Sequence, residues 1–250
     1  MNFLAAVVDF DRTLLHTDKS VSVYTVRVLW DWQKSGARLF AATARPERAI
    51  GQYCRQIAFD AVCTLNGART ITKDSVFENP IAEASALCVL DRLSGIPGIV
   101  LSVEAENGIY ANMDIPPWAP KVTDRLRDLP RKEKIYKILA SHPDVPAEKL
   151  AVDLPDDTYS SVADRKLLQV MSRTATKWNG VRNMLAAFRI DPAQALFFGD
   201  DNDDIEPIRK CGCGVAVRNA LENVLEAADE ITASNDEDGV ARFLERLMNQ

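Results

Sequence analysis

The stretch "LAAVVDFDRTLLHTD", from Leu4 to Asp18, opens with a run of apolar residues that ends at Asp9 and Asp11, two aspartates separated by one residue. A continuous apolar run over Leu4–Val8 predicts a central strand of a parallel sheet, because such a strand is buried on both faces. Two carboxylates at the end of a buried strand repel each other. We therefore expect a cation or hydrogen-bond donors to lie close to them.

Strand-like and helix-like segments alternate through both ends of the chain. The predicted strands are Leu4–Val8, Ala37–Ala42, Ala61–Leu65, Ala195–Phe198 and Gly214–Val217. The predicted helices are Val21–Lys34, Pro46–Ile57, Asn179–Phe188, Ile205–Lys210, Leu221–Ala228 and Gly239–Met248. This alternation predicts an α/β fold with a doubly wound, Rossmann-like parallel sheet.

The middle of the chain has a different pattern. Its predicted helices are Ile81–Leu93, Thr123–Leu129 and Arg131–Ser141, and its predicted strands are Ile99–Val103, Ile109–Asn112, "KLAVD" (149–153) and "KLLQVMS" (166–172). A hairpin with helices, bounded by breaks near Asn79–Pro80 and Arg173–Thr176, predicts an inserted α+β domain. We therefore expect residues 80–173 to form the insertion, and residues 1–79 and 174–250 to form the α/β core.

The composition excludes several classes of protein. The chain has 250 residues, of which 47% are hydrophobic, so it can bury a full core. A net charge of −6 argues against sequence-independent binding of nucleic acid. No apolar run has the length of a transmembrane helix, and residues 1–8 lack the features of a signal peptide. The five cysteines have no C-x-x-C spacing, which favours reduced thiols. We expect a cytoplasmic protein that binds neither nucleic acid nor membranes.

Polar side chains gather where the predicted core strands end. Asp9 and Asp11 follow the first strand, Thr43 follows the second, and the acidic run Asp200–Asp204 follows a later one, while Lys177 precedes a helix. In open α/β sheets the carboxyl ends of the strands form the ligand-binding edge. Oxygen-only ligands favour Mg²⁺. Carboxylates with a divalent cation, a lysine and a hydroxyl make a pocket that suits a phosphoryl group.

Four motifs in this order resemble the haloacid dehalogenase-like (HAD) phosphatase superfamily, over nearly the whole chain. "DFDRT" matches D-x-D-x-T, and "AATAR" matches the second motif, an apolar strand that ends in Ser or Thr. Lys177 in "RTATKWNGVRNML" matches the third motif, and "GDDNDDIEPI" matches G-D-x-x-x-D. "GVAVRNA" and "SNDEDGVARFLERL" further resemble the Cof-type branch, subfamily IIB, which carries a C2-type cap between the second and third motifs.

The resemblance implies a role for each matching residue in phosphoryl transfer. Asp9 would be the nucleophile that forms an aspartyl-phosphate. Asp11 would protonate the leaving alcohol and then activate water. Thr43 and the backbone of Ala44 would bind phosphate oxygens, and Lys177 would screen the charge between Asp9 and the phosphoryl group.

The resemblance also implies a Mg²⁺ site. Its ligands would be Asp9, the backbone carbonyl of Asp11, and Asp200, with Asp204 binding through water.

The chain departs from the family pattern at two positions. Asp203 stands where an asparagine is frequent, and the extra carboxylate could strengthen metal binding or weaken phosphate binding. Ala44 stands where glycine is more common, so its N–H serves phosphate only if the backbone there suits a residue with a side chain. Arg45, Asn66 and Gly67 are candidates for orienting the substrate.

The sequence therefore favours a Mg²⁺-dependent phosphatase with a cap, acting on a small phosphomonoester such as a sugar phosphate. Trp118, in the proline-rich loop of the insertion, is a candidate substrate contact. Two alternatives remain, which are phosphotransfer to a second substrate, as in mutases, and a non-catalytic phosphate-binding regulatory module. A receiver domain also combines aspartates, a threonine and a lysine, but it is shorter and has no insertion. Taken singly, each aspartate could merely cap a helix, and Lys177 could be a solvated charge.

Overall fold

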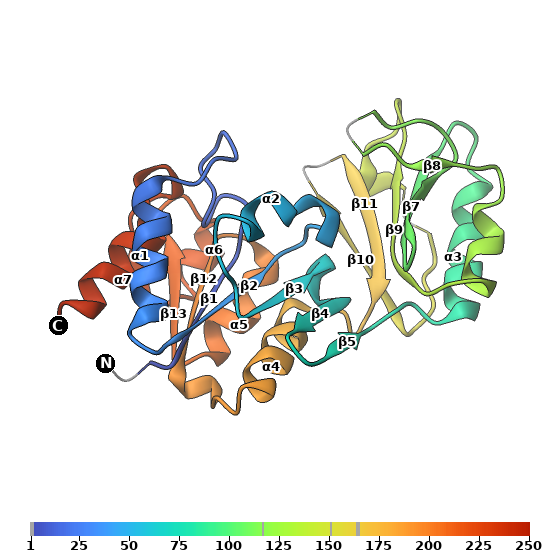
Figure 1. The fold of residues 1–250 in the computed structure, drawn as a ribbon. Helices are drawn as coiled ribbons and strands as arrows, with labels where there is room; N and C mark the ends of the chain where they lie inside the picture. The colour runs from blue at the N-terminus through green and yellow to red at the C-terminus, as the bar shows by residue number, and fades with distance from the viewer. Residues whose placement is uncertain (1–2, 117, 151, 164–165) are drawn as a thin grey trace. The chain divides into compact units, whose positions relative to one another are not determined.

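The computed structural model describes residues 3–116, 118–150, 152–163 and 166–250. The chain divides into two units, Met1–Glu78 with Thr176–Gln250, and Asn79–Ala175. Figure 1 shows a sheet with helices in each of them. No helix within the described residues is both long and apolar enough to span a membrane. All five cysteines are free thiols.

The first unit contains an eight-stranded sheet with six parallel strands and a terminal antiparallel hairpin. The strand order is β14 (Glu230–Thr232), β13 (Cys213–Val217), β12 (Ala195–Gly199), β1 (Ala5–Val8), β2 (Arg38–Ala42), β3 (Ala61–Thr64), β4 (Arg69–Thr72) and β5 (Val76–Glu78). All four residues of β1 are buried, as its apolar sequence predicts. The strand order reverses between β1 and β12, from which the chain winds outward in both directions.

Helices cover both faces of this sheet (Figure 1). On one face lie α1 (Val23–Lys34) and α7 (Gly239–Met248), and on the other lie α4 (Lys177–Ala187), α5 (Ile205–Lys210) and α6 (Glu222–Leu225). Successive residues of β1 point to opposite faces of the sheet. Ala6 and Val8 pack toward α1 and α7. Ala5 and Val7 pack toward α4 and α5. The predicted doubly wound α/β fold is confirmed.

Local signals mark both ends of α1, whereas α2 (Gly51–Cys54) and α6 are shorter than the helices predicted over Pro46–Ile57 and Leu221–Ala228. Ser22 caps α1 by accepting a hydrogen bond from Thr25 N, and Gly36 follows the helix with a φ of 93°. A 3₁₀ turn over Glu47–Ala49 leads into α2.

The second unit is built on a six-stranded sheet. Its order is β10 (Thr158–Ala163), β11 (Leu167–Ser172), β9 (Ile135–Ser141), β6 (Val100–Ala105), β7 (Gly108–Ala111) and β8 (Lys121–Val122). Neighbouring strands are antiparallel except β7 and β8. The helix α3 (Glu83–Ser94) packs with one face of the sheet in a separate apolar core. This is the α+β unit that the sequence predicts.

The helix predicted over Arg131–Ser141 is wrong, because Ile135–Ser141 forms β9 in the middle of the sheet. Six of the seven residues of β9 are buried. The buried residues include Lys137 beside apolar neighbours, so the segment shows no regular alternation of polar and apolar residues that would distinguish a strand from a buried helix.

Two further predictions in this unit are wrong. In place of a helix over Thr123–Leu129, a 3₁₀ helix spans Leu126–Arg131 and contains Pro130. The strand predicted at "KLAVD" is absent from the described residues of 149–153, where a 3₁₀ turn over Ala147–Lys149 comes first. Ala151 lies outside the described residues.

Candidate active site

The site lies where β1 and β12 end side by side. The two strands are parallel, with Val8 opposite Phe198, and Asp9 N donates to Phe198 O at 3.0 Å. Asp9 and Asp200 therefore leave adjacent strands at the same edge of the sheet. This edge includes the point where the strand order reverses, which is the usual place for a ligand in such sheets.

Three carboxylates meet at this edge. One oxygen atom from each of Asp9, Asp200 and Asp204 lies within 4.8 Å of the other two, and the three residues are at most 5% exposed. Burial, with the charges of Asp204 and Asp200, raises the pKa of Asp9 well above its ordinary value. Burial and the charge of Asp204 raise the pKa of Asp200 to about 7. The protein has thus assembled a negative site that favours uptake of positive charge.

The ammonium group of Lys177 brings one positive charge to this cluster of carboxylates. Its Nζ donates to Asp9 Oδ1 at 2.9 Å and to Asp204 Oδ1 at 2.5 Å, and the residue is 4% exposed. Burial opposes ionisation of this amine, but Asp204 and Asp9 outweigh it and raise the pKa of Lys177 well above its ordinary value. Lys177 opens α4, whose N-cap Thr176 accepts from Asn179 N at 3.1 Å.

The loop after β12 is shaped around Asp204. Asp204 Oδ2 accepts hydrogen bonds from the backbone N–H groups of Asp200, at 3.0 Å, and Asp201, at 3.1 Å. A Cβ atom on Gly199 would lie 2.5 Å from the Asp204 carboxyl carbon. The glycine in "GDDNDD" is therefore required by close packing against the aspartate that ends the motif.

The donor set fits a divalent cation. Three buried carboxylates face one ammonium group, so the cluster has a formal excess of negative charge, and all the candidate ligand atoms are oxygens. Hard divalent cations prefer such ligands. The raised pKa values of Asp9 and Asp200 reflect the cost of ionising buried carboxyl groups beside one another, which a bound cation would offset.

Thr43 follows β2 and is 1% exposed. Its backbone N donates to Cys63 O at 2.9 Å, and its Oγ1 accepts from Arg45 N at 3.2 Å, which leaves the hydroxyl proton to donate elsewhere. Ala44 is not among the residues with positive φ. The alanine is therefore accommodated at this position without the strain that a glycine-only conformation would impose.

Asp11 lies in a different environment from Asp9. Its two oxygens accept from Arg45 Nε at 2.6 Å and Arg45 Nη2 at 2.7 Å, and Lys19 Nζ donates to Oδ1 at 2.8 Å. Burial opposes ionisation of this carboxyl, but the hydrogen bonds from Arg45 and Lys19 outweigh it and lower its pKa to about 2. Tyr53 completes the group, since its hydroxyl donates to Lys19 O and accepts from Arg45 Nη1. We call Arg45, Lys19 and Tyr53 the Asp11 clamp.

The remaining candidates occupy distinct places. Asn66 is buried beside the acidic loop, and its Nδ2 donates to Asp203 Oδ2. Gly67 follows it with a φ of 96°. Trp118 belongs to the second unit, where its backbone N donates to Ile115 O at 2.8 Å.

Sequence reasoning missed several residues of this site. Thr13 Oγ1 donates to Asp200 Oδ1 at 2.9 Å, and Arg12 Nε lies 3.7 Å from Asp200 Oδ2. The contact between Thr13 and Asp200 could have been predicted, because Thr13 is the threonine of the "DFDRT" motif. Lys19 and Tyr53 belong to no motif, and nothing in the sequence connects them with Asp11.

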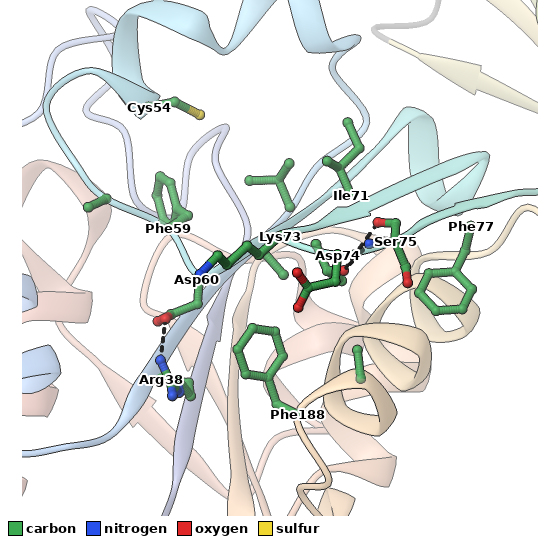
Figure 2. Close-up of a pocket in the computed structure, with 15 residues that line it drawn as sticks. Arg38, Cys54, Phe59, Asp60, Ile71, Lys73, Asp74, Ser75, Phe77 and Phe188 are labelled. Atoms are coloured by element: carbon green, nitrogen blue, oxygen red, sulfur yellow. Dashed lines mark hydrogen bonds and ion pairs between the residues drawn. The ribbon is translucent and has the colours of Figure 1, made fainter.

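A pocket of about 900 Å³ opens elsewhere in the first unit (Figure 2). It includes residues at the starts of β2 and β3, the turn between β4 and β5, and Phe188 after α4, and within it Arg38 donates to Asp60 at 2.7 Å. None of the predicted site residues lines it. This pocket lies at the amino-terminal ends of the parallel strands, whereas the carboxylates lie at the carboxyl ends.

The chain belongs to the haloacid dehalogenase-like hydrolases, because the model of that family matches residues 6–244. This match confirms the Cof-type resemblance, and the protein is a hydrolase of this family. It is similar to the putative phosphatase YxeH of Bacillus subtilis, at 25% identity over 261 residues, which is 96% of this chain and 97% of that protein. It is also similar to the 5-amino-6-(5-phospho-D-ribitylamino)uracil phosphatase YitU of Bacillus subtilis, at 24% identity over 262 residues, which is 96% of each chain.

A solved haloacid dehalogenase-like hydrolase from Bacteroides thetaiotaomicron has the same fold. The TM-score is 0.85 at 23% sequence identity, and the match covers 98% of this chain and 99% of that one. The likeness extends over both units and confirms the fold class.

Proposed function

We propose that the protein is a Mg²⁺-dependent phosphatase that hydrolyses a small phosphomonoester through an aspartyl-phosphate on Asp9. The observation that carries this proposal is the buried cluster of Asp9, Asp200 and Asp204, in which Lys177 donates to Asp9 and Asp204. A nucleophilic carboxylate beside a buried ammonium group and further metal-ligand oxygens suits attack on a phosphate ester.

The reaction has two steps. An oxygen of Asp9 attacks phosphorus, the bond between phosphorus and the ester oxygen breaks, and Asp11 gives its proton to the departing alcohol. Asp11 then takes a proton from water, whose oxygen attacks the aspartyl-phosphate and releases inorganic phosphate and the free Asp9 carboxylate. Both oxygens of Asp11 bind Arg45 in the structure, so this carboxyl must exchange partners before it serves as the acid.

The other residues bind the phosphoryl group and the metal. The Thr43 hydroxyl and the Ala44 N–H donate to phosphate oxygens, and Lys177 holds Asp9 and the phosphoryl group together. Asp9, the backbone carbonyl of Asp11, Asp200 and Asp204 would hold the Mg²⁺ ion. When bound, Mg²⁺ reduces the repulsion between the anionic nucleophile and the anionic substrate.

The inserted residues 80–173 act as a cap that selects the substrate, and residues 1–79 with 174–250 act as the catalytic core. A sugar phosphate or a similar small metabolite is the proposed substrate, and Trp118 is a proposed cap contact. The names of the relatives support a small phosphorylated metabolite, since one of them is a phosphatase of 5-amino-6-(5-phospho-D-ribitylamino)uracil.

The test is a screen of phosphate esters with Mg²⁺, using sugar phosphates and the ribitylaminouracil phosphate as substrates. The wild-type protein releases inorganic phosphate from at least one ester. Asp9→Asn lowers that rate by about three orders of magnitude or more, because an amide cannot form the covalent intermediate. Asp74→Asn, an identical change at an exposed turn of the same unit, is the control.

Equal rates for Asp9→Asn and the wild type would contradict the assignment of the nucleophile. Transfer of the phosphoryl group to a second organic substrate without release of phosphate would instead favour a mutase. Binding of phosphate with no turnover of any ester would favour a regulatory module.

A further inference from the structure

The segment Leu65–Gly67, which follows β3, has an unusual backbone. Three consecutive residues have positive φ angles, 51° at Leu65, 54° at Asn66 and 96° at Gly67, and all three are buried. Residues with side chains rarely adopt this conformation, and it persists only where the surroundings hold it. Such strain frequently accompanies a functional site.

The same segment contacts three parts of the proposed site. Leu65 N donates to Arg45 O at 3.0 Å, and Asn66 N donates to Thr43 O at 3.1 Å. A Cβ atom on Gly67 would lie 2.0 Å from the backbone oxygen of Thr176, which directly precedes Lys177. The segment therefore fixes the loop that carries Thr43 against the start of α4.

The side chain of Asn66 reaches the third part, the acidic loop. Asn66 is 1% exposed, and its Nδ2 donates to Asp203 Oδ2. An ionised carboxylate only accepts hydrogen bonds, so the amide nitrogen must face Asp203. Asn66 Oδ1 is buried without a hydrogen-bond donor among the described residues. The Asn66 amide therefore binds Asp203 through its nitrogen, while its oxygen makes no hydrogen bond among the described residues.

Asp203 directly precedes Asp204, whose Oδ1 accepts from Lys177 Nζ, and the negative charge of Asp203 also acts on this ammonium group. A lysine has three N–H donors, and in the structure Asp9 and Asp204 take two of them. The third is the donor that a phosphoryl oxygen needs. A carboxylate at position 203 that was not held by Asn66 would compete for it.

We propose that Asn66 is a positioning residue that holds the Asp203 carboxylate and so keeps a Lys177 donor available to the phosphoryl group. This inference rests on the proposed function, because it assigns Lys177 to phosphate. It also explains how the chain accommodates an aspartate at position 203, where the family frequently has asparagine.

The test is Asn66→Gly, which tolerates the left-handed backbone and removes only the side chain. Isothermal titration calorimetry of the Mg²⁺-loaded protein with inorganic phosphate should show affinity lowered by about tenfold, as expected for competition at one charged hydrogen bond. For the ester found in the screen, KM should rise while kcat changes by less than about threefold, because the nucleophile and acid are untouched.

The second test introduces Asn66→Gly into the Asp203→Asn variant, in which the loss of the Asn66 side chain should no longer matter. With a neutral amide at position 203, no carboxylate competes for Lys177, so adding Asn66→Gly should change phosphate affinity by less than about twofold. Asp203→Asn alone leaves the strained segment intact, and it should bind phosphate at least as tightly as the wild type. This second measurement stands even if Asn66→Gly does not fold.

An equal loss of affinity from Asn66→Gly in both backgrounds would assign the effect to the backbone segment and overturn the inference. Unchanged affinity in Asn66→Gly, or weaker binding by Asp203→Asn, would also overturn it. A wild-type protein that hydrolyses no ester and binds no phosphate would overturn the proposed function itself. If the wild type hydrolyses an ester and binds phosphate, but Asn66→Gly has the same effect in the wild-type and Asp203→Asn backgrounds, only the role of Asn66 is overturned.

Discussion

Asp9 and Asp11 are two residues apart, yet their surroundings shift their pKa values in opposite directions. Burial raises the pKa of Asp9, whereas the Asp11 clamp lowers the pKa of Asp11 to about 2 despite its partial burial. Different environments of this kind allow two carboxylates in one site to take different roles. At this scale the arrangement of donors around each oxygen decides the chemistry.

Arg45→Met removes the guanidinium that binds both oxygens of Asp11. We expect the pKa of Asp11 to rise from about 2 toward its ordinary value, measured by NMR titration of the carboxyl carbon. Because the folded-state pKa is depressed, the clamp stabilises the fold above the unfolded pKa, and this stabilisation is lost as pH falls through about 2. The difference in unfolding free energy between wild type and variant should therefore be smaller at about pH 3 than at neutral pH.

Arg38→Met is the matched control, since it breaks a pair with Asp60 at the opposite edge of the sheet. This control should leave the titration of Asp11 unchanged. An unchanged Asp11 titration in Arg45→Met would show that the clamp does not set its charge.

The sequence predicts which residues meet in the site but not how they pair. Asp9, Lys177 and Asp204 come together because each lies at the end or start of an element whose type the local pattern predicts correctly. The Asp11 clamp could not be predicted, because Lys19 and Tyr53 lie in segments whose path depends on tertiary packing. The spacing of the motifs predicts that their residues lie at the same edge of the sheet, but it does not predict which side chains bind one another.

At the scale of elements, α4 is the helix that delivers Lys177, and its depth is set by a glycine. A Cβ atom on Gly180 would lie 2.1 Å from Cys63 Sγ on β3. Gly180→Ala should therefore push the helix away from the sheet, lowering the unfolding free energy by about 1–3 kcal/mol, as overpacking does. It should also lower phosphatase activity, because Lys177 moves with the helix.

Gly51→Ala is the matched control for that change. A Cβ atom on Gly51, at the start of α2, would meet only the Arg55 guanidinium at 3.7 Å. Alanine at this site should leave stability unchanged or raise it slightly. The free energies of unfolding of both variants are measured in urea. Equal values would show that α4 accepts a Cβ atom at position 180 without moving away from β3.

Element type was harder to predict in the second unit than in the first. Strands of the first unit alternate with amphipathic helices, so their boundaries are marked by changes of period. The segment Ile135–Ser141 is enclosed by neighbouring strands, and its sequence has no period of its own. Its strand conformation is decided by pairing with β6 and β11, which are distant in sequence.

At the scale of the whole molecule, the acidic cluster should couple folding to pH and to metal. The folded-state pKa values of Asp9 and Asp200 are raised, so between about pH 4 and about pH 7 the folded protein holds protons that the unfolded chain has released. Without metal, the unfolding free energy therefore falls as pH rises through this range. The proposed Mg²⁺ ion would bind the ionised carboxylates, so its stabilising effect should grow with pH over the same range.

Thermal unfolding in EDTA and in Mg²⁺, between about pH 5 and pH 8, measures both trends. Asp200→Asn should flatten the dependence of the melting temperature on pH in EDTA and reduce the effect of Mg²⁺, because it removes one titrating carboxyl group of the cluster. A melting temperature that rises with pH in EDTA would contradict the proposed coupling.

The pairing of β1 with β12 also determines when this protein can become complete during its synthesis. β1 is synthesised well before β12, yet one of its two edges is filled only by Ala195–Gly199. Until then, a fully apolar strand keeps an unpaired edge, which is the kind of surface that chaperones shield. In the nascent chain β1 therefore keeps one unpaired edge until β12 has been made, and the cluster of Asp9, Asp200 and Asp204 can assemble only after that.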